Sequence, residues 1–559
     1  MFARIVIVVL VLVCPAVFPE GALSQQDLSD RVRALFDACD RPETPGGFAA
    51  AVIKDGRVLF KGAYGFANSE HEVPFTTHTV TDLASVAKQI TGFAVAALIQ
   101  EGRLSLDDDV RRYVPEVPDF GDPITVRHLL YHTSGLRDWV GLVKISGRYT
   151  EDVITDDFLM RLVMNQQDLN FRPGERFQYS NTGYFLLAKI VSRAAEQPFS
   201  AWMRDNVFLP LGMNNTQIGY DHRTIIPNRA SSYKKVSSGD YQNSTSNLES
   251  YGSSSLFSTL DDMVKWVANY ETRSIGGPDI WDMMLQEGAL NSGETVNYGF
   301  GISINDDRSI INYGHGGSWG GYLSQVTYYP ELRLAYVLMT NRDPSGVYVD
   351  DDLLRLFLPD TSGQEADEPV ELSQRTQVEI DPDLLDDYVG TYEFFDNVVT
   401  IEAKSDHLLA RLPWETAAFY PESDNRFFRK EFDAQLAFLR DDKGVVDRLV
   451  YYFRGSANRP FRKLDWDVSE HPDLADLLGE YYSPELRTRY TMMISDNRLI
   501  LRHLHNEDVV LLRRDRDHYL GDSWWCEEIE IVRDQNDQIT GFTLTADNGN
   551  VQQLVFVKL

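Results

Sequence analysis

The sequence predicts an α+β domain, built on one antiparallel sheet with flanking helices and a helical subdomain, followed by two small antiparallel β-barrels. Strand patterns lie at both ends of residues 25–360 with helical patterns between them, so both ends of this segment are expected to share the sheet. Residues 361–380 are rich in Asp, Ser, Gly, Glu and Pro, a composition typical of linkers. Residues 381–466 and 467–559 then repeat one pattern of short β-branched and aromatic runs separated by turn residues.

Residues 1–24 have the pattern of a secretory signal peptide. Arg4 precedes an apolar block, Ile5 to Phe18, and Ala22-Leu23-Ser24 supplies small residues before the cleavage point. The block is short for a membrane span and contains Pro15, so we expect no stable membrane anchor after cleavage. The mature protein is therefore expected to be exported, to the periplasm or the extracellular space.

Charge and cysteine content narrow the possible partners. The 559-residue chain has a formal net charge of −31, which disfavours nucleic acid as a partner. Cys39 and Cys526 remain after cleavage, and the sequence leaves open whether they form a disulfide. No His-Glu-x-x-His spacing occurs, and we expect no metal and no other cofactor. The sequence carries no signal for oligomeric state.

Elements of residues 25–360 follow in order from local patterns. Periodicity predicts helices over Gln26 to Cys39, Ser200 to Phe208 and Thr259 to Tyr270. Alternating apolar runs predict two hairpins, Gly47 to Tyr64 turning at Asp55-Gly56, and Tyr322 to Thr340 turning near Pro330-Glu331.

The two C-terminal modules carry the same motif at the same place. Three pairs of segments recur: Leu385-x-Asp387-x-x-Gly390-x-Tyr392 as Leu474-x-Asp476-x-x-Gly479-x-Tyr481, Arg440-Asp441 as Arg533-Asp534, and Lys463-Leu464 as Lys558-Leu559. Two copies are too few for a solenoid, so we expect two separate barrels.

Ser85-Val86-Ala87-Lys88 begins a helical pattern that runs from Ala84 to Gln100 and ends before Gly102. A spacing of three residues brings the serine hydroxyl and the lysine amine together on one side of a helix. A serine hydroxyl becomes a good nucleophile only when a neighbouring base takes its proton. We expect this helix to be amphipathic, with the pair away from a packing stripe formed by Val86, Ile90, Phe93, Ala94, Ala97 and Leu98.

The same spacing recurs at Ser231-Lys234 and Ser232-Lys235, and Tyr241-x-Asn243 follows them. These residues lie in the polar stretch Ser231 to Asn247, which the sequence predicts to be a loop. The gap between serine and tyrosine there is too short to hold a helical subdomain. We therefore select Ser85 as the candidate nucleophile.

Two further motifs complete a set. Tyr179-Ser180-Asn181 follows a turn at Arg172 to Glu175, and Gly314-His315-Gly316-Gly317-Ser318 precedes the second hairpin. With the Ser-x-x-Lys helix, they resemble the serine beta-lactamase, penicillin-binding protein and D-aminopeptidase superfamily, most closely its class C branch. The resemblance extends through His132-Thr133-Ser134-Gly135-Leu136 and Tyr298-Gly299-Phe300-Gly301.

The resemblance implies acyl transfer through an acyl-enzyme on Ser85. Lys88 is the implied base, which requires its pKa to be lowered by its surroundings. Tyr179 is implied to share the proton and pass it to the leaving atom. Asn181 is implied to hydrogen-bond both Lys88 and an amide of the substrate, a small molecule or a peptide.

The second implied feature is an oxyanion hole made by the backbone N–H groups of Ser85 and Ser318. Gly316 and Gly317 are implied to let the substrate backbone lie against the strand. His315 stands where lactamases carry the lysine of Lys-Thr-Gly, and a histidine is mostly neutral at pH 7. This difference argues against carboxylate recognition of the lactamase kind.

A histidine at this position resembles the D-aminopeptidase branch, whose members also carry two C-terminal β-barrels. In that branch a loop of the last barrel reaches the active site and selects a free amino terminus. Glu507 and Asp508 are the candidates for that contact in this chain.

Alternative interpretations remain at three points. Gly316-Gly317-Ser318-Trp319-Gly320 matches a nucleophile elbow with Ser318 as the nucleophile, but a strand pattern, not a helix, follows it. His132 fits either a catalytic base or a structural residue that supports a turn, and we favour the second. For the whole protein the leading hypothesis is a peptidase or amidohydrolase acting on D-amino-acid-containing peptides or peptidoglycan fragments. A carboxylesterase and a non-catalytic cell-envelope binding protein are the alternatives.

Overall fold

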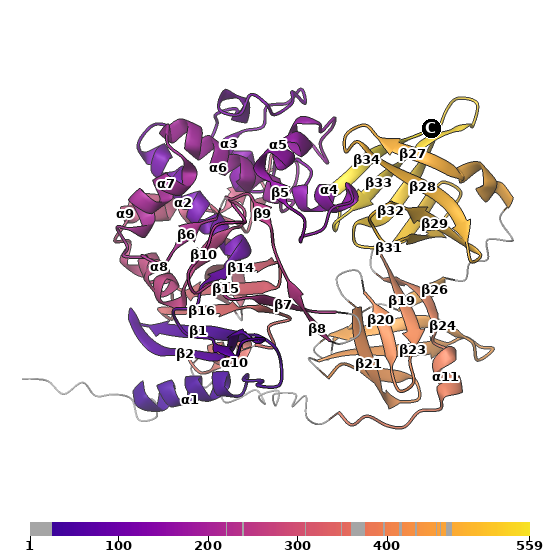
Figure 1. The fold of residues 1–559 in the computed structure, drawn as a ribbon, viewed down its shortest axis with the longest axis horizontal. Helices are drawn as coiled ribbons and strands as arrows, with labels where there is room; N and C mark the ends of the chain where they lie inside the picture. The colour runs from indigo at the N-terminus through magenta and orange to yellow at the C-terminus, as the bar shows by residue number, and fades with distance from the viewer. Residues whose placement is uncertain are drawn as a thin grey trace, which may run out of the picture.

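The computed structural model describes residues 25–559 except for residues 220, 237–239, 308, 348, 359–374, 395–396, 413–415, 431–432, 454–455, 459 and 465–471. The predicted signal peptide and most of the predicted linker lie outside the described residues. An N-terminal α+β domain is followed by two barrels that lie beside it (Figure 1). None of the helices in the described part of the chain combines the length and apolarity needed to cross a membrane.

A seven-stranded antiparallel sheet organises the N-terminal domain, in the order β13-β14-β15-β16-β1-β2-β3. The first strand of the chain pairs with the last long strand of the domain, with Phe48 opposite Thr340 and Lys54 opposite Leu334. The prediction that both ends of the domain share one sheet is therefore confirmed. The strands are β1 Gly47–Lys54, β2 Arg57–Asn68, β3 Val73–Pro74, β13 Ser303–Asp307, β14 Ile310–Trp319, β15 Tyr322–Tyr329 and β16 Leu334–Thr340.

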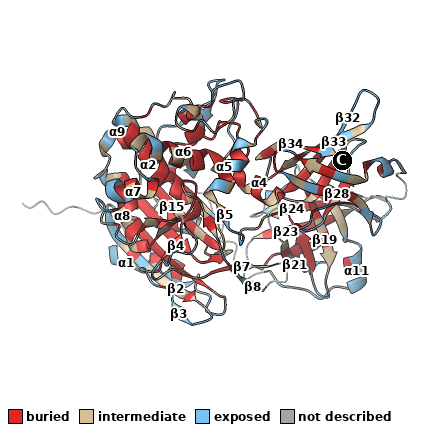
Figure 2. Cartoon of the chain, turned by 45° about the horizontal axis from the view of Figure 1, so that its top comes forward, coloured by how far each residue is buried: buried red, intermediate tan, exposed pale blue. Residues whose placement is uncertain are grey.

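Helices cover both faces of this sheet. On one face, α1 (Gln25–Asp37) and α10 (Asp350–Arg355) pack on alternate residues of β1 and β16. On the other face, a larger core joins the sheet to the central helices, and Figure 2 shows this buried interior. The central helices are α2 Ala87–Gln100, α8 Leu260–Thr272 and α9 Gly277–Met284.

The helical subdomain stands on this second face, on the far side of α2 from the sheet. It contains α3 Val126–Leu130, α4 Trp139–Ile145, α5 Asp156–Met164, α6 Asn181–Ala195 and α7 Phe199–Met203. The helix predicted over Ser200 to Phe208 is α7 followed by a π-helical turn, Arg204–Phe208. The other two predicted helices, observed as α1 and α8, are confirmed within one or two residues. Both predicted hairpins are also present, but the second strand of the first runs to Asn68, four residues beyond the predicted end at Tyr64.

Short strands join these layers. β4 (Thr81–Asp82) and β6 (Gln217–Ile218) flank β10 (Leu256–Ser258), while β5 (Ile154–Thr155) pairs in parallel with β9 (Leu248–Glu249). A further short hairpin joins β11, Gly288–Ala289, to β12, Thr295–Val296.

Two sequence predictions for this domain are wrong. The α2 helix is not amphipathic, because every residue from Ala87 to Leu98 is buried, with α6 and α9 packed against the helix. The predicted loop Ser231 to Asn247 contains a hairpin of β7 (Ser232–Lys235) and β8 (Tyr241–Ser244). This hairpin is anchored by parallel pairing of β7 with β17 (Arg342–Asp343), a contact distant in sequence.

Both C-terminal modules are closed antiparallel barrels, as predicted. The first begins with a short helix, α11 Pro382–Asp386, and its ring closes where β23 pairs with β24. Its strands are β18 Gly390–Phe394, β19 Asn397–Ala403, β20 Leu408–Arg411, β21 Thr416–Ser423, β22 Arg426–Phe428, β23 Ala434–Arg440, β24 Val446–Phe453 and β26 Phe461–Leu464, with β25 Ser456–Ala457 beside β24.

The second barrel closes where its first strand pairs with its last. Its strands are β27 Gly479–Ser483, β28 Thr488–Ser495, β29 Arg498–Arg502, β30 Val509–Arg513, β31 His518–Ser523, β32 Cys526–Arg533, β33 Ile539–Ala546 and β34 Val551–Lys558.

The sequence repeat has a structural meaning. The repeated tyrosines are fully buried and donate to a backbone oxygen four residues earlier, Tyr392 to Tyr388 at 2.9 Å and Tyr481 to Leu477 at 2.6 Å. The repeated lysine of the closing strand donates to a backbone oxygen near the module start in both barrels. The repeated residues thus make equivalent contacts where the first and last strands of each barrel pair.

The two barrels relate differently to the N-terminal domain. The first barrel has a separate apolar core and contacts the second through a small cluster, Val398 with Leu512 and Leu520. The core of the second barrel is continuous with that of the N-terminal domain, and α4 lies between them (Figure 1). Cys39 follows α1 whereas Cys526 is buried in β32, and no disulfide joins them.

Candidate active site

The Ser-x-x-Lys segment lies where β14 crosses the head of α2. Ser85 belongs to a 3₁₀ turn, Ala84–Val86, which leads directly into the helix. Gly317 of β14 packs so closely on this turn that a Cβ atom there would lie 2.2 Å from Leu83 O and 3.1 Å from Ser85 N. A glycine at 317 is therefore required for the strand to approach the serine backbone.

The Lys88 side chain forms hydrogen bonds with Ser85 and with two further groups. Its Nζ lies 3.0 Å from Ser85 Oγ, 2.8 Å from Asn181 Oδ1 and 2.9 Å from Ser253 O. The side chain is 0% exposed, and burial lowers the pKa of Lys88 from 10.5 to about 7, against the opposing charge of Asp138. A large fraction of this amine is neutral near pH 7 and able to accept a proton.

Asp138 fixes the orientation of Asn181. The Asn181 Nδ2 donates to Asp138 Oδ1 at 3.3 Å, and the Asn181 backbone N–H donates to the other carboxylate oxygen. Because Nδ2 faces the carboxylate, the amide oxygen faces Lys88. Asp138 also caps α4, accepting from Val140 N at 2.8 Å, and burial raises the pKa of its carboxyl.

Tyr179 completes the group around the serine. Burial raises its pKa, and a hydrogen bond with Ser85 opposes that effect. The Lys88 Nζ lies 4.9 Å from the centre of the Tyr179 ring. Because its pKa is raised, the phenol keeps its proton at neutral pH and is able to donate it.

His132 supports the Tyr179-Ser180-Asn181 segment, in agreement with a structural role. Its ring lies 4.5 Å from that of Tyr179, and Nδ1 accepts from Ser180 N at 3.0 Å. Burial and the charge of Lys88 lower the pKa of His132 well below its usual value, so the ring is neutral.

His315 is also neutral, and its tautomer follows from its partners. Nδ1 lies 2.5 Å from Gly316 O, which only accepts, so Nδ1 carries the proton. Nε2 then accepts from the Tyr298 hydroxyl at 2.9 Å. Burial, with a smaller contribution from Lys88, lowers the pKa of His315 to about 3. A fixed cation is therefore missing from this position of β14.

Side chains alternate across β14. Gly317 faces Ser85 on one side of the sheet, so the Ser318 side chain faces the other side. The nucleophile-elbow alternative fails on this geometry as well as on the β15 strand that follows.

The backbone of Ser318 lies at a free edge of the sheet. β13 pairs with β14 only as far as Gly314, and β14 joins β15 through Gly320 and Gly321, both with positive φ. In such a two-residue turn Trp319 and Tyr322 form a hydrogen-bonded pair, and the alternation then turns the N–H of Ser318 toward the free edge.

A loop of the second barrel covers α4, which forms one wall of the site. Glu507 lies 3.2 Å from Lys144 of α4, whereas Asp508 pairs with Arg502 of its own barrel. The Glu507 side chain is 73% exposed. Of the two candidate residues, only Glu507 therefore reaches the N-terminal domain.

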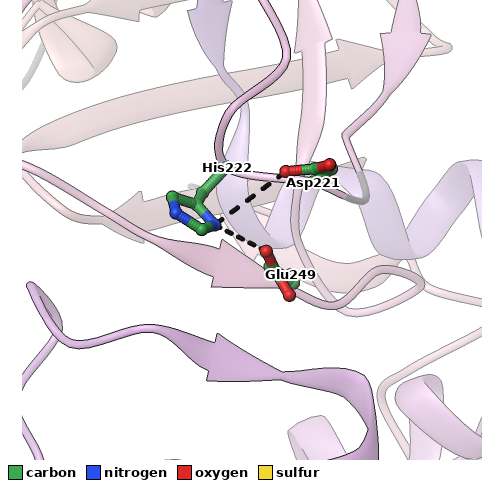
Figure 3. A group of neighbouring side chains, drawn as sticks. All are labelled: Asp221, His222 and Glu249. Atoms are coloured by element: carbon green, nitrogen blue, oxygen red, sulfur yellow. Dashed lines mark hydrogen bonds and ion pairs between the residues drawn. The ribbon is translucent and has the colours of Figure 1, made fainter.

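A second cluster has metal-ligand chemistry. Asp221, His222 and Glu249 offer ligand atoms within 4.8 Å of one another (Figure 3). His222 Nδ1 lies 2.5 Å from Glu249 Oε1, and Arg223 binds both oxygens of Asp221 at 2.9 Å. Because each of these groups already has a hydrogen-bond partner within the protein, we assign the cluster no metal.

The structure brings together the residues that the sequence analysis selected around Ser85. It adds Asp138, which no sequence motif indicated, and it gives Tyr298, named above only as part of a motif, a contact with His315. Asp138 precedes an apolar run, which is the signal of a helix cap. That signal does not reveal the contact with Asn181, 43 residues further along the chain.

At the head of a helix under an antiparallel sheet, a buried lysine with a lowered pKa is hydrogen-bonded to a serine. This arrangement defines a serine hydrolase. A family model described as Beta-lactamase matches residues 32–359, more than half of the chain. The protein belongs to the beta-lactamase family.

Relatives share this assignment at low identity. The chain is 25% identical to penicillin-binding protein 4* of Bacillus subtilis over 449 residues, covering 76% of this chain and 97% of the relative. It is 25% identical to a D-aminopeptidase of Brucella anthropi over 320 residues, covering 57% and 60%. A penicillin-binding protein homologue from Pyrococcus abyssi, described as octameric, has the same fold, with a TM-score of 0.52, 21% identity and coverage of 86% and 98%.

Proposed function

We propose that the protein is an exported hydrolase that cleaves amide bonds in D-amino-acid-containing peptides or peptidoglycan fragments through an acyl-enzyme on Ser85. The observation that carries the proposal is the 3.0 Å contact between Ser85 Oγ and the buried Lys88 Nζ. Similarity to D-aminopeptidases over 297 and 320 residues supports the choice of substrate class.

The chemistry follows from the positions of the groups. Lys88 takes the proton of Ser85 as the hydroxyl oxygen attacks the carbonyl carbon, and the carbonyl electrons move onto the oxygen. The N–H groups of Ser85 and Ser318 hold this oxyanion, where one donor contributes about 3 kcal/mol. Tyr179 donates its proton to the leaving nitrogen, the C–N bond breaks, and the proton on Lys88 replaces the one Tyr179 gave.

Deacylation reverses these roles with water as the nucleophile. The water loses a proton to the Tyr179–Lys88 pair, adds to the acyl carbon, and the proton returns to Ser85 Oγ as the ester bond breaks. We propose that Asn181, held by Asp138, orients both Lys88 and a substrate amide.

A carboxylesterase is the second candidate. His315 is neutral and buried, so this position of β14 offers no charge for the carboxylate that many peptide substrates carry. An ester substrate without a carboxylate does not need a positive charge at this position, so a neutral His315 does not weaken its binding.

Turnover of D-alanyl anilides and of p-nitrophenyl esters by the purified protein separates the two candidates. The proposal expects anilide hydrolysis that disappears in Ser85→Ala. Ester hydrolysis without anilide hydrolysis favours the carboxylesterase. No turnover of either, with ligand binding by the barrels, favours a binding protein.

A further inference from the structure

Asp82 is a buried carboxylate next to the reactive pair that the mechanism above does not use. It ends β4 and is 3% exposed, and it pairs across the sheet with Phe257 of β10. Burial raises the pKa of Asp82 to about 7, and the positive charge of Arg229 opposes this effect.

The first group held by Asp82 belongs to the turn that presents the nucleophile. The backbone N–H of Ala84 donates to Asp82 Oδ1 at 2.8 Å. Ala84 has φ of 46°, in the left-handed region that a residue with a Cβ atom rarely adopts. Since Ala84 immediately precedes Ser85, this conformation sets the direction of the Ser85 backbone.

The second group held by Asp82 belongs to the segment that binds the base. The backbone N–H of Ser255 also stabilises the charged form of Asp82, and Ser255 has φ of 60°. Two residues earlier, Ser253 O accepts from Lys88 Nζ at 2.9 Å. One carboxylate therefore interacts with a left-handed residue on each side of the reactive pair.

Resting on the proposed function, we propose that Asp82 is a positioning residue that holds Ala84 and Ser255 in left-handed conformations and so aligns Ser85 with Lys88. A strained backbone persists only where surrounding contacts enforce it. A carboxyl group has one oxygen for each of the two N–H groups, whereas an amide offers a single oxygen and an N–H₂ group that faces one of the donors.

Asp82→Asn tests the proposal because it keeps the size of the side chain and removes one acceptor. The measurement is the rate of covalent labelling by a fluorophosphonate, separated into the maximal rate and the half-saturating concentration, on protein whose thermal unfolding is also recorded. Misplacement of the nucleophile lowers the maximal rate about 10- to 100-fold and leaves the half-saturating concentration within about twofold.

Rescue by glycine gives a readout that a general loss of stability does not. Glycine adopts positive φ without a Cβ clash, so Ala84→Gly in the Asp82→Asn background relieves the need for the carboxylate. We expect this double variant to regain about tenfold in maximal rate. The matched control is Glu196→Gly in the same background, because Glu196 ends α6 with φ of 53° on the protein surface. It relieves strain of the same kind away from Ser85 and leaves the labelling rate low.

Two results overturn the proposal: an Asp82→Asn rate within twofold of the unchanged chain, or equal recovery from Ala84→Gly and Glu196→Gly. If Asp82→Asn does not fold, the same comparison is made with Asp82→Glu, which keeps the charge and displaces the oxygens. Failure of the proposed function is distinguishable, because then the unchanged chain itself takes no label at Ser85.

Discussion

Arg137 of the N-terminal domain and Glu485 of the second barrel form a buried ion pair, with 3.2 Å between Arg137 Nη1 and Glu485 Oε2 and side chains 2% and 5% exposed. Arg137 also donates to Gln552 O of the barrel at 3.0 Å. The next residue is Asp138, whose backbone N–H donates to Asn550 O of the same barrel at 3.0 Å. The second barrel is thus attached directly behind the residue that orients Asn181.

Glu485→Ala is expected to destabilise the protein by about 3–5 kcal/mol, because it leaves the Arg137 charge buried without its partner. Chemical unfolding followed by fluorescence measures this change. The matched control is Glu480→Ala in the same barrel, whose 3.5 Å pair with Arg489 is exposed and is expected to contribute less than about 1 kcal/mol. Equal losses in the two variants contradict this interpretation.

The rate of acylation is expected to fall tenfold per pH unit below about pH 7. The folded pKa of Lys88 lies below its ordinary value, so the neutral base is present above about pH 7 and is lost by protonation as pH falls. The pH dependence of kcat/KM on an activated ester measures this. An acid limb near pH 4, or a rate independent of pH, contradicts the assignment of Lys88 as the base.

Asp138→Asn is expected to lower kcat about 10- to 100-fold, because an amide at 138 no longer accepts from both N–H groups of Asn181. The Asp138 charge raises the pKa of Lys88, so removing it moves the acid limb to lower pH. A lower kcat together with a shifted acid limb is the expected result, and pH profiles of the unchanged chain and of Asp138→Asn measure both. A lower rate with an unshifted limb indicates loss of structure only.

His315→Gln is expected to make the free energy of unfolding depend less steeply on pH between about 6.5 and 3. The folded pKa of His315 is about 3 and its ordinary value is 6.5, so the unfolded chain binds an extra proton between these pH values. This proton costs the folded protein up to about 1.4 kcal/mol per pH unit as pH falls from 6.5 toward 3. Urea unfolding at several pH values measures the slope. An unchanged slope in the variant contradicts a buried neutral histidine.

Local patterns were sufficient for much of the fold and for the reactive pair. Hairpins with Asp-Gly or Pro-Glu turns, and the Ser-x-x-Lys spacing at the start of a helix, are encoded within a few residues. The amphipathic interpretation of α2 failed because Ala, Thr and Gly between the apolar residues also allow close packing. Gly92, for example, lies where a Cβ would be 2.1 Å from Phe300 O.

Contacts between distant segments could not be predicted in this way. β7 became a strand because β17 lies beside it, and Ser232 and Lys235, three residues apart on a strand, face opposite sides of it. The sequence around Asp138 is typical of a helix cap. Its second role, orienting Asn181, depends on the positions of the backbones of the second barrel and of α6.

The role of Ser85 as nucleophile is tested most directly by intact-protein mass after incubation with a fluorophosphonate, run beside Ser85→Ala and Ser318→Ala. We predict one covalent adduct on the unchanged chain and on Ser318→Ala, and none on Ser85→Ala. An adduct that survives Ser85→Ala, or that is lost in Ser318→Ala, contradicts Ser85 as the nucleophile.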